Sequence, residues 1–188
     1  MWQMNKQIIT IVKSNDCISL QNYILAHPTD TLQETLISIC RICIDYDNEC
    51  LLEHTLNSFP TYTKEIHEMV TQYCCSRGSF KCLKTLITTL DYSITSFCFN
   101  TLVTFGRKLR YIKCLKFLLE EFDLPPNINL YKHCYDIGMF EYLLSLKING
   151  AEKINGIILL RFANQLFEEE EKSKYPHTLK YLESNSLL

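Results

Sequence analysis

Apolar residues follow a helical spacing along most of the chain. Five leucines, separated by 31, 32, 32 and 28 residues, each stand early in an apolar stretch: Leu20, Leu51, Leu83, Leu115 and Leu143. Around them apolar side chains recur at positions i, i+3 and i+4, which places one apolar stripe on one side of a helix. A repeat of this length predicts stacked two-helix units rather than one mixed core.

Two of the predicted units share more than a leucine. Phe80-Lys81-Cys82-Leu83-Lys84 returns as Ile112-Lys113-Cys114-Leu115-Lys116. The lysines of both segments fall outside the apolar stripe, where their charged ends can reach water. We therefore expect these segments to be equivalent second helices of two units.

A first helix is expected before each leucine-bearing helix. The predicted ranges are Asn5–Lys13, Gln33–Asp45, Lys64–Ser76, Phe99–Lys108, Leu130–Asp136 and Asn155–Glu171. Proline, asparagine, aspartate and glycine gather in the connectors, where they end one helix and let the chain turn. The pattern predicts an all-α fold of five to six degenerate helix-turn-helix units in a single domain over 1–188. A compact helical bundle that captures a partner helix in a groove is the alternative.

The third unit carries a resemblance to a known family. The segment from Tyr73 to Ile87 resembles the second half of an ankyrin repeat, with Cys74 and Cys75 where that family has small residues and Gly78 at its turn glycine. Gly138 holds the same place in the fifth unit. In the other units the turn position falls on three larger residues: Asn15, Tyr46 and Arg110.

The resemblance implies an ankyrin-like helical repeat solenoid. The chain lacks the Thr-Pro-Leu-His opening and the usual hairpin pattern of that family, so its repeats are degenerate. In style it is similar to the ankyrin-like multigene-family and host-range proteins of poxviruses and African swine fever virus. That similarity implies a virulence factor that binds host signalling proteins of innate immunity.

Composition narrows the classes of partner. The chain is 47% hydrophobic and 21% charged, as soluble folded proteins are, and its net charge of −2 gives no argument for nucleic acid or for an anionic membrane. The apolar run Ile8–Val12 is too short for a signal peptide, and no stretch reaches the length of a membrane span. A cytoplasmic location is expected.

Ten cysteines raise the question of metal or thiol chemistry. Most lie within apolar helical segments, where a free cysteine packs as a small hydrophobic residue. The one CxxC motif, Cys40 to Cys43, lacks the further ligands that zinc requires. We expect no metal, cofactor or small-molecule substrate, and no enzymatic activity. A cysteine-dependent enzyme is the less favoured alternative, since with five histidines some Cys–His contact can arise in any fold.

The densest basic segment is Arg107–Lys116, at the turn before the fourth leucine. Basic side chains mixed with tyrosine suit a protein-binding surface, because tyrosine gives a large contact area with a hydrogen-bonding end. A solvated turn is the simpler interpretation of so short a run. The predicted partner-binding residues are those of this turn and of two connectors: Arg107, Lys108, Arg110, Tyr62 and Tyr92.

Overall fold

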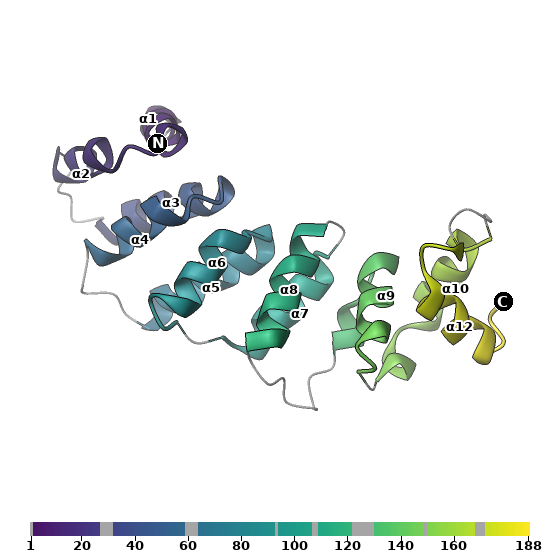
Figure 1. The fold of residues 1–188 in the computed structure, drawn as a ribbon. Coiled ribbons are helices and arrows are strands. Elements are labelled where there is room, and N and C mark those ends of the chain that lie inside the picture. Colours follow the sequence, from purple (N-terminus) through teal and green to yellow (C-terminus); the bar gives the residue numbers. More distant parts are fainter. Residues whose placement is uncertain are drawn as a thin grey trace. The chain divides into compact units, whose positions relative to one another are not determined.

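The structure, a computed structural model, describes residues 2–26, 32–58, 64–92, 94–106, 109–121, 130–148, 150–167 and 172–188. Within these ranges the chain forms eleven α-helices, two short 3-10 helices and no strand (Figure 1). The predicted all-α class is confirmed. The chain divides into two compact units, Met1–Cys98 and Phe99–Leu188. The single domain over 1–188 stays a prediction.

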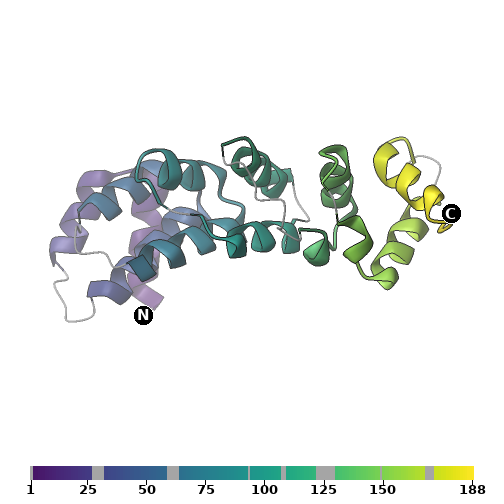
Figure 2. The ribbon, with the colours of Figure 1, turned by 90° about the horizontal axis from the view of Figure 1, so that it is seen from below.

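The first unit contains three helix pairs, seen from two directions in Figures 1 and 2. Each first helix contacts the next first helix (α1 with α3, α3 with α5), and α4 contacts α6. The predicted first helices are thus confirmed to within a few residues at their ends. The bounds are α1 Trp2–Ser14, α2 Cys17–Ala26, α3 Leu32–Asp45, α4 Glu49–Asn57, α5 Lys64–Arg77 and α6 Phe80–Thr88.

The second unit is less regular, and the helix predicted over Leu130–Asp136 is wrong. Only a four-residue 3-10 helix, η1, forms there, because Asp136 already serves as the N-cap of α9 and accepts a hydrogen bond from the Met139 N–H. α9 contacts η1 and α12, and α10 contacts α12. The bounds are α7 Ser96–Thr104, which begins in the first unit, then α8 Leu109–Glu121, η1 Leu130–His133, α9 Ile137–Ser145, η2 Ala151–Lys153, α10 Gly156–Gln165 and α12 Pro176–Ser184.

The repeated leucines are core residues in both units. All five are fully buried: Leu20, Leu51 and Leu83 lie in the second helices of the three pairs of the first unit, and Leu115 and Leu143 lie in α8 and α9 of the second unit. The flanking lysines 81, 84, 113 and 116 are exposed, as the apolar stripe predicts. Burying a leucine side chain stabilises the fold by roughly 2–3 kcal/mol, so the sequence period marks the positions that hold each pair together.

Each pair of the first unit turns through one residue with a left-handed backbone. Asn15, Asp47 and Gly78 have φ values of 54°, 51° and 61°. In the third pair the Ser79 N–H donates to the Cys74 carbonyl over 3.1 Å, and the other two turns make the same bond, the helix-ending pattern that a left-handed residue allows. Asn15 and Gly78 were therefore placed correctly at the turn.

The three other predicted turn residues, Tyr46, Gly138 and Arg110, do not lie at turns of this kind. In the second pair the turn residue is Asp47 and not Tyr46, because a short polar side chain tolerates the left-handed region better than a bulky ring. Gly138 is wrong as a turn residue, since it lies inside the first turn of α9. Arg110 likewise lies inside α8, and residues 107–108 before it are outside the described residues.

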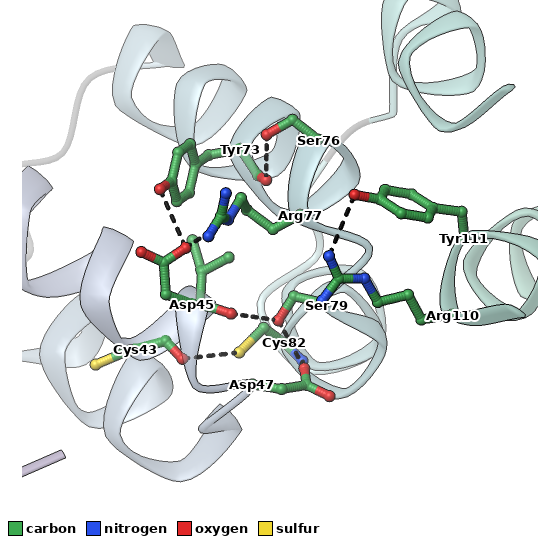
Figure 3. A network of polar contacts seen from close by, with 11 residues as sticks. Cys43, Asp45, Asp47, Tyr73, Ser76, Arg77, Ser79, Cys82, Arg110 and Tyr111 are labelled. Carbon is green, nitrogen blue, oxygen red and sulfur yellow. Dashed lines mark hydrogen bonds and ion pairs between the residues drawn. The ribbon is translucent and has the colours of Figure 1, made fainter. Parts of the chain in front are cut away.

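Polar contacts tie consecutive pairs together. The Asp47 carboxylate accepts hydrogen bonds from the N–H groups of Lys81 (3.0 Å) and Cys82 (3.2 Å). The Ser79 hydroxyl lies 2.7 Å from the same carboxylate (Figure 3). These donors lie at the N-terminus of α6, whose own N-cap residue, Ser79, makes no capping bond. Helix N–H groups at this position need acceptors. The preceding pair supplies them.

The same device recurs within the second unit. At the N-terminus of α12, the Glu141 carboxylate of α9 accepts from the N–H groups of His177 (3.0 Å) and Thr178 (2.7 Å). A contact of the opposite kind joins the first two pairs: the Asn48 side chain donates to the Val12 carbonyl, near the C-terminus of α1, over 3.0 Å. Partners in these contacts are 32 to 37 residues apart, close to the leucine period.

Candidate interaction surface

The sequence-predicted binding residues do not form one described surface. Arg107, Lys108 and Tyr62 lie outside the described residues. Arg110 is exposed in the first turn of α8, where its guanidinium lies 5.1 Å from the centre of the Tyr111 ring. Its Nη2 donates to the Tyr111 hydroxyl over 3.4 Å (Figure 3). Arg110, next to Tyr111, is therefore the one predicted binding residue of this turn that lies within the described residues.

Tyr92 is not the exposed tyrosine that the sequence suggested. Its side chain is buried, and its ring stacks on His67 with 3.9 Å between ring centroids. Burial raises the pKa of Tyr92 to about 12 and lowers that of His67. The prediction that Tyr92 is exposed is wrong, because its ring packs against the His67 ring on α5 instead of extending into solvent.

A different group of polar side chains lies along the first helices of the first unit. We call it the first-helix edge, and it consists of residues from the C-terminal halves of α1, α3 and α5 and from the turn after α3: Lys13, Arg41, Asp45, Tyr46, Tyr73 and Arg77. A basic residue in the last helical turn, as in α1 and α5, is favoured by the helix dipole. The helix ends thus explain why cations gather here.

Two cations of this edge stack on tyrosines of the next pair. The Lys13 ammonium lies 5.3 Å from the centre of the Tyr46 ring, and the Arg41 guanidinium lies 5.4 Å from that of Tyr73. The partners are 33 and 32 residues apart. A cation over a ring face is attracted to it by about 0.5–1 kcal/mol at exposed sites. These contacts add a second tie between pairs, at the surface.

Asp45 is the acidic centre of the edge. Its Oδ1 lies 2.6 Å from Arg77 Nε and accepts from the Tyr73 hydroxyl over 3.1 Å (Figure 3). The pKa of Tyr73 is raised, first by burial and then by this carboxylate. Arg77 also lies over the Tyr73 ring, 5.9 Å from its centre. Arg77 is therefore neutralised within the protein, whereas among the described residues no carboxylate pairs with Lys13 or Arg41.

Sequence reasoning missed this edge although a signal was present. Lys13, Asp45 and Arg77 stand 32 residues apart in succession, the same interval as the central leucines. A polar position that recurs with the core period must lie at equivalent places on successive units. The basic run at Arg107–Lys116 drew attention because it is dense along the chain, which says nothing about proximity in space.

The cysteines serve mainly as core residues. None of the ten forms a disulfide bond, and eight are buried, including both residues of the CxxC motif. Burial raises the pKa of Cys40 and Cys134 to about 12, and that of Cys43 and Cys82 is raised as well, so their thiols are poor nucleophiles. The described residues hold no cluster of His, Cys, Asp and Glu that could bind a metal ion.

Cys98 differs from the other cysteines in its hydrogen bonding. A hydrogen bond with Cys75 and contacts with Thr95, whose Oγ1 lies 3.6 Å from the sulfur, lower the pKa of Cys98 to about 6 against the effect of burial. Only 1% of its side chain is exposed. A substrate therefore has no access to this thiol in the folded protein.

Alkylation of the native protein should follow exposure rather than pKa. We expect iodoacetamide to modify Cys50, the exposed thiol, at least about tenfold faster than Cys98, because a buried sulfur reacts only when the fold opens. Peptide mass spectrometry at timed intervals measures both rates, with urea-unfolded protein as the control. Equal rates for the two thiols in the native protein would instead favour the cysteine-enzyme alternative.

Comparison with known proteins found no similar protein. No protein-family model, curated protein or solved structure matches the chain. Among the described helices, none is both long and apolar enough to span a bilayer.

Proposed function

We propose that the chain is a non-enzymatic protein-interaction module built as an ankyrin-like array of degenerate helix pairs. The contacts of α1 with α3 and of α3 with α5 support this, as do the capping bonds that cross from one pair to the next. Stacked pairs present equivalent side chains side by side, and repeat proteins use such surfaces to bind partners.

The first-helix edge is the observation that carries the proposal. It exposes Arg41 together with Tyr46, whose side chain is 45% exposed. Arginine and tyrosine are enriched among the residues that dominate binding energy at protein interfaces, because both combine a flat surface with hydrogen-bonding groups. Held over tyrosine rings, the cations of this edge are also ordered before a partner arrives, which reduces the entropy lost on binding.

The partner class follows from the resemblance of the sequence. The degenerate, cysteine-rich repeats are similar in style to the ankyrin-like multigene-family and host-range proteins of large cytoplasmic DNA viruses. We therefore propose host proteins of innate immune signalling as partners and the host cytoplasm as the site of action. Nucleic acid, membranes and small-molecule substrates are not part of this proposal.

Affinity capture followed by direct binding tests the function. The tagged full chain is expressed in cells with an intact interferon response, and the proteins retained with it are identified by mass spectrometry. The strongest candidate is then purified and titrated against the chain by calorimetry. A direct complex with a dissociation constant of about 10 μM or tighter supports the function. Failure of every captured candidate to bind directly would exclude it.

A further inference from the structure

The first-helix edge carries excess positive charge. It has three cations, Lys13, Arg41 and Arg77, and one carboxylate, Asp45, which is already engaged by Arg77. Lys13 and Arg41 are exposed, and their described contacts are with the rings of Tyr46 and Tyr73. Contact with a ring orders a cation without neutralising it. Two positive charges therefore remain for a ligand.

The stacked geometry leaves hydrogen-bond donors available. The Arg41 guanidinium lies over the Tyr73 ring and makes no hydrogen bond with a described residue. A guanidinium presents its N–H groups in a planar fork that matches a carboxylate. An ammonium over a ring keeps donors directed away from it. Arg77 is different because its Nε is already 2.6 Å from Asp45. The donors of Arg41 and Lys13 are thus positioned for carboxylates from outside.

We propose that the pairs Lys13–Tyr46 and Arg41–Tyr73 form a docking site for an acidic peptide segment of a partner protein. This inference rests on the proposed function, and it names the chemistry of the partner. Carboxylates of the segment bind the two cations, and its backbone and apolar groups lie against the exposed Tyr46 ring. An acidic peptide fits better than nucleic acid, because nucleic-acid binding depends on many phosphate contacts, whereas this surface offers two cations, Lys13 and Arg41, that no described carboxylate pairs with.

The test measures binding of a fluorescein-labelled hexaglutamate peptide to the full chain by fluorescence anisotropy at low salt. The variant K13Q/R41Q removes both charges and keeps unbranched polar side chains, which are shorter than those they replace. The matched control K6Q/K84Q removes two exposed lysines of the same unit. We expect binding to weaken about tenfold in K13Q/R41Q and less than about twofold in the control, since two charge-assisted contacts are lost only in the first.

A third variant checks that the loss reflects geometry. In R41K the charge remains while the planar fork is lost, so we expect binding between that of the wild type and that of K13Q/R41Q. Circular dichroism melting curves confirm that all variants are folded. The melting temperature of K6Q/K84Q should match that of the wild type because both lysines are exposed. That of K13Q/R41Q should fall by only a few degrees, since it loses two exposed cation–ring contacts of about 0.5–1 kcal/mol each.

Several outcomes would overturn the inference. They are no binding of the peptide by the wild type, equal losses in K13Q/R41Q and K6Q/K84Q, or tighter binding of a labelled uridine oligonucleotide than of hexaglutamate. Binding of the captured partner to K13Q/R41Q distinguishes failure of the docking site from failure of the proposed function. If that partner binds K13Q/R41Q as tightly as the wild type, the docking site is wrong and the interaction function stands.

Discussion

Replacing Phe140 with alanine is expected to lower the free energy of unfolding by about 3–5 kcal/mol. Phe140 is fully buried in α9, and its ring contacts those of Tyr131, Phe162 and Tyr181 at centroid distances of 5.8, 5.2 and 5.5 Å. Alanine would leave a cavity among three rings that η1, α10 and α12 hold in place. Urea denaturation followed by circular dichroism measures the loss.

Phe167→Ala is the matched control for this substitution. The Phe167 side chain is 64% exposed, so its removal should change the free energy of unfolding by about 0.5 kcal/mol or less. Equal effects of the two substitutions would mean that the aromatic cluster around Phe140 is not the core of the second unit.

Replacing Asp47 with alanine is expected to cost about 3 kcal/mol in the first unit. The carboxylate accepts from two N–H groups at the start of α6 and lies 2.7 Å from the Ser79 hydroxyl. Alanine also tolerates the left-handed φ of 51° less well than aspartate. The same urea denaturation measures the change.

The substitution Asp47→Asn separates the effect of the negative charge from the effects of the acceptor oxygen and the left-handed backbone. Asparagine keeps an acceptor oxygen and tolerates the left-handed backbone, and it removes only the negative charge, so its cost should be about 1 kcal/mol. If asparagine is as harmful as alanine, charge alone matters. If neither substitution has an effect, Asp47 does not stabilise the contact between pairs.

The core could be predicted from the sequence because burial leaves a periodic record. All five repeated leucines are fully buried, and the first helices of the three pairs in the first unit match their predicted ranges to within three residues. The prediction failed at Leu130–Asp136, where the apolar residues are present but the N-cap of α9 leaves room for only one turn. Apolar spacing shows which residues are buried and does not show where a helix must end.

The turns were less predictable because glycine has several uses. Gly78 is a left-handed turn residue, whereas Gly138 lies within a helix. In the second pair the prediction missed by one residue, although the choice between Tyr46 and Asp47 could have been made from the preference of short polar side chains for the left-handed region. The capping bonds between pairs join residues more than 30 positions apart and leave no local pattern.

The candidate surface was the least predictable feature. Tyr92 was chosen for its polar end, but stacking on His67 buries it. The first-helix edge was overlooked since its members are scattered along the chain, and only the stacking of α1, α3 and α5 brings them into one region. Searching for polar residues at the core period would have found Lys13, Asp45 and Arg77.

Amide hydrogen exchange at Lys81 and Cys82 tests most directly whether consecutive helix pairs are joined through shared caps. Both N–H groups lie in the first turn of α6, where a helix supplies no acceptor of its own, and both donate to Asp47. In the wild type and in Asp47→Asn, these amides should be protected at least about tenfold more than in Asp47→Ala. Equal protection in Asp47→Ala and the wild type would contradict the shared cap.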